Sequence, residues 1–103
     1  MERRLEGVKL IVSRNDTSNN HRGNFDIIAD ILYASHGGVK KTFLMYRCNL
    51  SFKQLKNYSH FLLNSGLLHV VTEHDQHDYG LFEVTSKGKE FLRAYRGLKD
   101  LMR

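Results

Sequence analysis

The segment 51–66 constrains the fold more than any other part of the chain. Ser51 is followed three residues later by Gln54, the spacing of a capping box at a helix start, and Gly66 is a typical helix stop. At about 3.6 residues per turn, the apolar side chains gather on one side, namely Phe52, Leu55, Tyr58, Leu62 and Leu63. The opposite side carries Lys53, Asn57, His60 and Asn64. The segment therefore predicts a helix over about 51–65 with one packing face and one polar face.

Two more helices are predicted before this segment. The first covers residues 24–36, with Asn24 as its N-cap and an apolar repeat that stops at Gly37 and Gly38. The second covers 39–47, and we expect the apolar side chains Val39, Phe43, Leu44 and Tyr46 to face inward. Residues 48–50 are then a tight connection between two helices, which is the arrangement of a helix-turn-helix.

The remaining segments predict a hairpin and a last helix. Residues 67–73 and 81–85 are short and partly β-branched, and the polar run HDQHDYG separates them. A helix capped by Thr85 or Ser86 then runs to Met102. The order predicts an α+β, mainly helical fold: a winged helix-turn-helix with a two-stranded wing and a C-terminal dimerisation helix.

Three parts of the chain follow from this order. Residues 1–23 are an N-terminal extension, a short strand followed by a mobile polar loop; 24–85 are the winged helix-turn-helix domain; 86–103 are the C-terminal helix. With 103 residues, the chain is long enough for one core but too short for two.

The run GGVKKTFLMYRCNLSFKQLKNYSHFLLNSGLL, followed by FEVTSKGKEFL, resembles the small archaeal winged helix-turn-helix proteins that are predicted transcriptional regulators. The resemblance covers about residues 24–96. It implies a DNA-binding domain, often dimeric through the terminal helix, in which Thr42, Ser51, Lys53, Gln54 and Asn57 approach DNA. The chain departs from the family in its long N-terminal extension and in the acidic wing tip HDQHD, where many wings are basic.

Charge is unevenly distributed along the chain. The net charge is +5, but residues 39–66 hold five basic residues and no acidic one, whereas residues 67–85 hold four acidic ones. A polyanionic partner would therefore meet the protein mainly through the middle block. This pattern favours double-stranded DNA as the partner.

The residue types in the middle block suit two kinds of DNA contact. Long polar side chains on the third helix can recognise base edges in the major groove: Lys53, Gln54, Asn57 and His60. Cations and a hydroxyl around them would hold phosphates: Lys40, Lys41, Thr42, Arg47 and Lys56. Ser51, at the start of that helix, completes the predicted interface.

The last helix carries an apolar stripe beyond the needs of a small core. Phe91, Tyr95, Leu98 and Met102 follow one another at spacings of four, three and four residues. Phe91 can close the core, but the later side chains need another cover. A second copy of the chain would supply a matching helix, so we expect a homodimer.

Other function classes find little support in the sequence. One cysteine, Cys48, in an apolar turn and the lack of a Gly-rich phosphate loop predict a protein that is not an enzyme and has no cofactor. A hydrophilic loop explains HDQHD without a metal, so no metal site is predicted. The apolar runs are too short to cross a membrane, and no export signal precedes them, so we expect a cytoplasmic protein.

Two rival functions stay open at this point. A winged helix can serve as a protein-interaction adaptor without DNA binding, because one fold hosts many functions. The HDQHD tip could also make the protein a metal-sensing or pH-sensing regulator.

Overall fold

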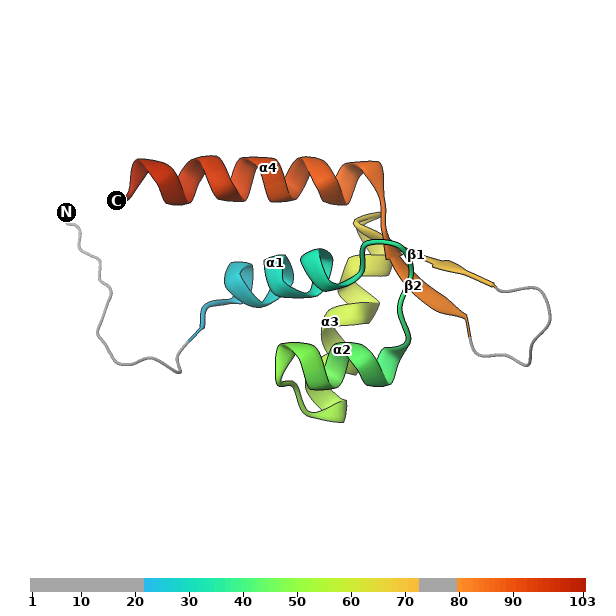
Figure 1. Ribbon diagram of the computed structural model, residues 1–103. Helices are drawn as coiled ribbons and strands as arrows, with labels where there is room; N and C mark the ends of the chain where they lie inside the picture. The colour runs from blue at the N-terminus through green and yellow to red at the C-terminus, as the bar shows by residue number, and fades with distance from the viewer. Residues whose placement is uncertain (1–21, 73–79) are drawn as a thin grey trace.

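The helix predicted from the capping box is α3 (Phe52–Asn64), and its neighbours follow in the predicted order. A computed structural model describes residues 22–72 and 80–103, in which α3 is joined by α1 (Asn24–Ala34), α2 (Lys41–Cys48), β1 (Leu68–Val71), β2 (Leu81–Val84) and α4 (Ser86–Leu101). Figure 1 shows α1, α2 and α3 together beneath α4, with the strands projecting to one side. The predicted winged helix-turn-helix is confirmed. The strand and loop expected within residues 1–21 and the HDQHD tip lie outside the described residues.

The core lies where α1, α2 and α3 meet. Its fully buried side chains come from all three helices: Ile31, Leu32, Leu44 and Leu62, with Leu55 almost as deep. Each such side chain stabilises the fold by about 1.5–3 kcal/mol through removal of its surface from water. Tyr58 Oη donates a hydrogen bond of 2.6 Å to Asn24 Oδ1, which ties α3 to the start of α1.

A left-handed residue and a capping box build the connection between α2 and α3. Asn49 ends α2 with a φ of 56°, a conformation that asparagine adopts more readily than most residues. The chain then leads directly into the box, because Ser51 Oγ accepts from the Gln54 backbone at 3.1 Å while Gln54 Oε1 accepts from the Ser51 backbone at 2.9 Å. Both predicted halves of the capping box are present, and they fix where α3 begins.

Replacing Ser51 with alanine should lower the free energy of unfolding by about 1 kcal/mol, because one helix N–H loses its acceptor. Chemical denaturation measures the loss. Ser51→Asp is the matched control, since aspartate also caps helices, and it should restore most of the stability. Equal midpoints for Ser51→Ala and the wild type would contradict the capping role.

The wing is a two-stranded antiparallel sheet that gains a third, very short segment. In β1 and β2, Leu68 lies opposite Val84 and Val71 opposite Leu81. Val39 forms an isolated bridge to Phe82, with hydrogen bonds of 2.9 and 2.8 Å in the two directions. The second helix therefore begins at Lys41 and not at 39, because the sheet edge engages the backbone of Val39.

Some local expectations were wrong. The N-cap of α1 is Gly23 and not Asn24, and the Asp26 carboxylate accepts the Gly23 N–H at 3.1 Å. Tyr46 and Phe52, expected to face inward, are 84 % and 58 % exposed, and Phe43 is 45 % exposed. An eight-residue α2 buries only one narrow strip, which Leu44 and Cys48 fill with Met45 partly buried beside them, so Phe43 and Tyr46 stay at the surface.

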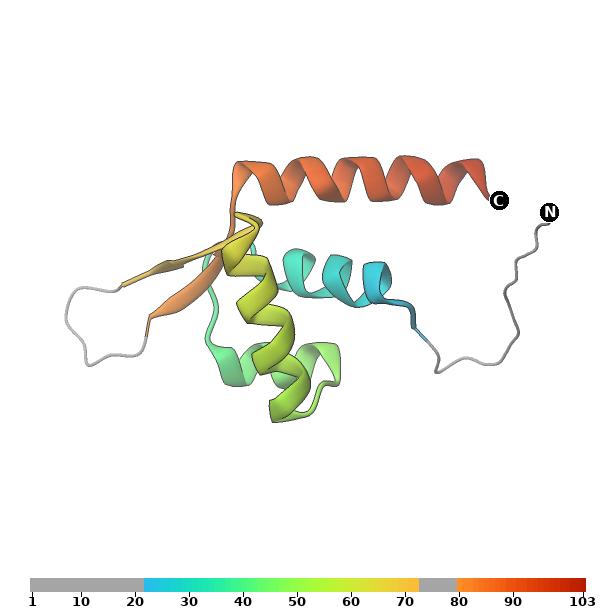
Figure 2. The ribbon, with the colours of Figure 1, turned by 180° about the vertical axis from the view of Figure 1, so that it is seen from behind.

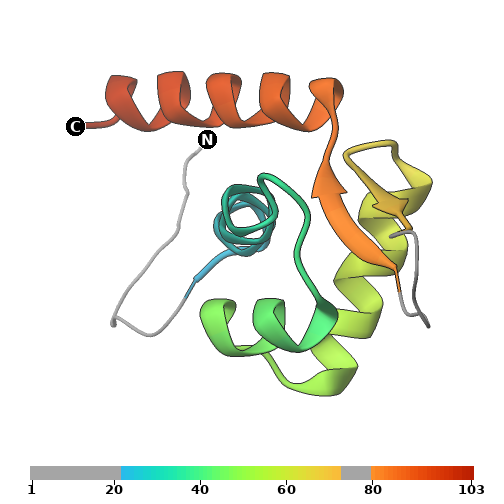
Figure 3. The ribbon, with the colours of Figure 1, turned by 45° about the vertical axis from the view of Figure 1, so that its right-hand side comes forward.

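Helix α4 starts at the base of the wing and crosses above α1 (Figures 1 and 3). Thr85 caps it as predicted, because Thr85 Oγ1 accepts from the Gly88 N–H at 2.9 Å and donates to the Gly66 carbonyl at 2.6 Å. The ring of Phe91 meets that of Phe25 edge-on at 6.0 Å. These contacts join α4 to the base of the wing and to α1.

Candidate nucleic-acid interface

The outward face of α3 carries the side chains predicted to recognise bases. Lys53, Asn57 and His60 are exposed, whereas Leu55 and Leu62 on the opposite side are buried. Seen from behind, α3 lies on the near side of the molecule (Figure 2). The helix therefore presents a continuous polar strip that no other described element covers.

Two of the predicted DNA-contact residues, Ser51 and Gln54, also form the capping box of α3. Ser51 and Gln54 are exposed, but their side chains hydrogen-bond the backbone in the capping box. Gln54 Oε1 is occupied in this way, which leaves its amide NH₂ for a base or phosphate. The first turn of α3 is thus held rigidly beside the side chains of its outward face.

The start of α2 adds cations next to the start of α3. Lys40, Lys41 and Thr42 are exposed, and Lys41 Nζ lies 5.8 Å from the centre of the Phe52 ring. This cation–π contact brings a lysine of α2 to the first turn of α3. Lys56, also exposed, lies on the flank of α3.

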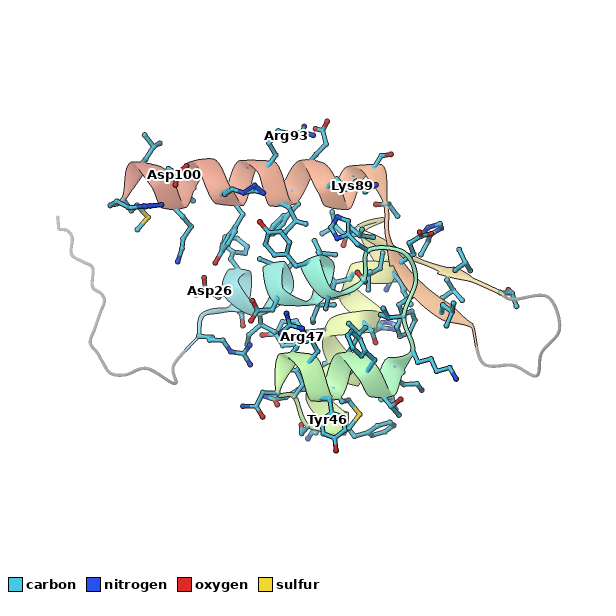
Figure 4. The ribbon with its side chains drawn as sticks, in the orientation of Figure 1. Asp26, Tyr46, Arg47, Lys89, Arg93 and Asp100 are labelled. Carbon is cyan, nitrogen blue, oxygen red and sulfur yellow. The ribbon has the colours of Figure 1, made fainter. Side chains whose placement is uncertain are left out.

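Arg47 lies apart from this group. It lines a hollow with Asp30, Tyr33 and Cys48. Figure 4 shows Arg47 between α1 and α2. Helical rotation explains the separation, because Arg47 and Lys41 lie on opposite flanks of the buried strip of α2. Among the four predicted contacts on or beside α2, only Lys41 has a described contact with α3, whereas Lys40 and Thr42 line a hollow on α2 itself.

The cations around α3 have no acidic partner within the described residues. The five ion pairs there involve Arg22, His69, Arg93, Lys99 and Arg103. None involves Lys40, Lys41, Lys53 or Lys56. No described carboxylate therefore competes with an external anion for these four cations.

Sequence reasoning missed one exposed residue of the outward face. Phe61 is 52 % exposed and lies about 40° around the helix from Asn57. The helical period places Phe61 next to Asn57, but its aromatic side chain does not fit the polar pattern that identifies this face. Phenylalanine can contact the methyl group of thymine, so Phe61 belongs to the candidate interface.

The four residues predicted for dimerisation fall into two pairs. Phe91 and Tyr95 are partly buried against α1, and their rings stack at 6.3 Å. Leu98 and Met102 are 53 % and 75 % exposed, and Leu101 beside them is 83 % exposed. The first pair thus completes the domain, and the second lies on an uncovered end of α4.

A polar contact also joins α4 to α1. Tyr95 Oη donates a hydrogen bond to Asp26 Oδ1, and Lys99 Nζ lies 3.8 Å from the same carboxylate. Partial burial raises the pKa of Asp26, but the hydrogen bonds from Tyr95 and Gly23 and the nearby cations outweigh this effect, so the pKa lies below its usual 3.8. Burial and the bond to Asp26 raise the pKa of Tyr95.

The lowered pKa predicts how stability depends on pH. Since the pKa of Asp26 is lower in the folded state, its ionised form adds stability above about pH 4, and this contribution is lost as the pH falls through the folded-state value. We expect Asp26→Asn to have a lower melting temperature than the wild type at pH 7. The difference between the two melting temperatures should disappear below about pH 4. Thermal melts at several pH values measure it. Tyr95→Phe should also reduce the pH dependence of the melting temperature. A difference in melting temperature between Asp26→Asn and the wild type that is constant with pH would contradict the role of Asp26.

Among 22–72 and 80–103, no three His, Cys, Asp or Glu side chains come together. No helix in these ranges has the length and apolar character to span a membrane. Cys48 is 3 % exposed, and burial raises its thiol pKa, which disfavours the reactive thiolate.

Comparison with known proteins gives a family and a fold. Residues 21–103 match the family described as winged helix-turn-helix. The structure of Sso10a-2, a DNA-binding protein from Sulfolobus solfataricus, superposes with a TM-score of 0.67 at 25 % identity, over 79 % of this chain and 82 % of that one. No curated protein matches the sequence.

Two transcriptional regulators share the fold at lower identity. The zinc-dependent MarR family regulator AdcR matches with a TM-score of 0.54 and 11 % identity, over 78 % of this chain and 55 % of its own. The M. tuberculosis regulator MosR matches with a TM-score of 0.53 and 19 % identity, over 77 % of this chain and 59 % of its own.

Proposed function

Since this chain belongs to the winged helix-turn-helix family, we propose that it is a DNA-binding transcriptional regulator or a small nucleoid-associated protein of an archaeal cytoplasm. The observation that carries the proposal is the outward face of α3, where exposed polar side chains are flanked by cations without acidic partners among the described residues. The likeness to the DNA-binding Sso10a-2 supports it.

The proposed mechanism is binding without catalysis. α3 enters the major groove, where Asn57 suits adenine and Lys53 suits guanine, and His60 serves as donor or acceptor. Lys40, Lys41 and Lys56 hold phosphates on either side and so fix the orientation of the helix. Phe61 adds an apolar contact on the same face.

A homodimer would place two such helices on one duplex. The exposed end of α4, with Leu98, Leu101 and Met102, is the proposed contact between two copies. Because Phe91 and Tyr95 pack α4 against α1, the position of that contact would set the distance between the two copies of α3. The half-site spacing of the DNA follows from that distance.

An interaction adaptor is the alternative function. A hollow on α2 is lined by Val39, Lys40, Thr42, Phe43 and Tyr46, and two of these side chains are exposed aromatics. Aromatic residues are enriched in protein–protein interfaces, so this surface favours a protein partner. Strong salt dependence of duplex binding separates DNA binding from the adaptor function.

Replacing Lys53, Asn57 and His60 with alanine tests the proposal. All three side chains are exposed, so the fold should be intact, whereas duplex affinity should fall about 100-fold or more through loss of base contacts. Fluorescence anisotropy measures the affinity, and thermal melting checks the fold. Arg103→Ala, which removes one exposed cation elsewhere, is the control and should bind normally. A triple variant that binds like the wild type would leave the adaptor as the better explanation.

A further inference from the structure

A second cationic site lies away from α3, between α1 and α4. A hollow of about 480 Å³ opens there, and its lining includes Tyr33, His36, Lys89, Leu92, Arg93 and Arg96. Figure 4 shows Lys89, Arg93 and Asp100 along α4, above α1. No residue of α3 contributes to it, so the proposed DNA contact does not account for these cations.

The positive charge in the hollow is only partly balanced from within the described residues, because Asp100 is the one carboxylate in its lining. Lys89, Arg93 and Arg96 follow at spacings of four and three, which places them on one face of α4. Lys89 and Arg96 form no ion pair with a described residue, and Arg93 reaches only Glu90, at 3.7 Å. Like charges at this spacing destabilise a helix, and an anion between them would reverse the effect.

Tyr33 and Leu92 add an aromatic and an aliphatic side chain to the lining of the hollow. Leu92, 4 % exposed, forms its floor, and the Tyr33 ring is stacked with His36 at 6.5 Å and covered by Arg96 at 5.9 Å. Gly97 adds space, since a Cβ there would have no neighbour within 4 Å. An aromatic and aliphatic surface beside three cations suits an anion with a planar apolar body more than a bare inorganic ion.

Two carboxylates argue against a nucleic-acid backbone along α4. Asp100 lines the same hollow and pairs with Arg103 at 3.1 Å, while Glu90 lies near Arg93. A phosphate chain running along the helix would meet both acidic groups, whereas a small ligand can occupy the part bounded by Arg93, Arg96 and Tyr33. A volume of about 480 Å³ also falls in the range of small-molecule sites.

We propose that this hollow binds a small aromatic carboxylate or phosphate, and that such a ligand is an effector of the regulator. Its anionic group would lie between Arg93 and Arg96, and its ring against Tyr33 and Leu92. Because the ligand would touch both α1 and α4, it would favour one angle between them and so alter the spacing of the two α3 helices. The effector role rests on the proposed DNA-binding function, whereas the binding site itself does not.

Titration with benzoate and with phenyl phosphate at constant ionic strength tests the site. Amide signals of Tyr33, Leu92 and Gly97 should shift in a saturable way in NMR spectra, with a Kd near or below ~1 mM, while those of α3 stay unchanged. Benzamide, which has the same ring without the charge, should bind at least tenfold more weakly. Equal binding of benzamide, or no shift with either anion, would overturn the site.

Two matched double variants locate the binding. Arg93→Gln with Arg96→Gln should weaken benzoate binding about tenfold or more, because charge-assisted hydrogen bonds are lost. Lys53→Gln with Lys56→Gln removes the same charge from α3 and should leave benzoate binding unchanged. Equal loss in the two variants would show a general charge effect and overturn the assignment.

Duplex binding in saturating benzoate tests the effector role separately. We expect the Kd for a duplex to change at least threefold in the wild type and not in the Arg93→Gln, Arg96→Gln variant. If benzoate binds and duplex affinity is unaltered, the effector role is wrong. A protein that binds benzoate but no duplex would refute the proposed function and still support the site.

Discussion

Raising the salt concentration from about 50 to about 200 mM should weaken duplex binding by about 10⁴-fold. The proposed DNA contact includes four cations of each protomer, namely Lys40, Lys41, Lys53 and Lys56, so a dimer would neutralise about eight phosphates. Each neutralised phosphate releases counterions, which predicts a slope of log affinity against log salt near −7. Anisotropy titrations over a salt series measure this slope.

A double substitution at the end of α4 tests whether the protein binds DNA as a dimer. Leu98→Glu with Met102→Glu puts charge on the exposed side chains of the proposed contact, and burying that charge between two copies is costly. The variant should sediment as a monomer. Its slope of log duplex affinity against log salt should be about half that of the wild type. A wild type that sediments as a monomer, with a shallow slope that the substitutions leave alone, would remove α4 from the mechanism.

Gly88→Ala should destabilise the fold by about 3 kcal/mol, because a Cβ has no room at this position. A Cβ at Gly88 would lie 2.4 Å from the Leu67 carbonyl oxygen and 2.6 Å from Val84 Cγ2. The carbonyl cannot move freely, since it accepts the Thr85 N–H at 3.1 Å. The start of α4 would have to leave the base of the wing.

Gly97→Ala on the same helix is the matched control. Nothing lies within 4 Å of its Cβ position, so only helix propensity acts, and it favours alanine by about 1 kcal/mol. Chemical denaturation should show opposite signs for the two variants. If Gly88→Ala is also stabilising, the close approach of α4 to the wing is absent in solution.

The sequence was most informative where structure depends on neighbours along the chain. The capping box of Ser51, the cap of Thr85 and the order of helices and strands follow from side chains a few positions apart, and all agree with the structure. The polar face of α3 follows from the helical period for the same reason. Expectations failed at Val39, whose backbone joins a strand distant in sequence, and at Tyr46 and Phe52, which are apolar but have no room in the core.

In the candidate DNA interface, too, some residues could be predicted from the sequence and others depend on tertiary packing. Residue type and spacing alone select Lys53, Asn57 and His60, and the structure has all three exposed on one face. They could not show that Arg47 lies on the other flank of α2, because the buried strip of that helix is decided by contacts with α1 and α3.

The sequence by itself determined the order of the helices, the caps of α3 and α4 and the cationic block of residues 39–66, since periodicity, capping and charge are local properties. Only the tertiary structure decided which surfaces these elements form together. Tyr33 and His36 are more than fifty residues from Lys89, yet packing of α4 over α1 makes them walls of one hollow. The need for glycine at position 88 arises from the same packing, because the carbonyl that excludes a Cβ belongs to the turn before the wing.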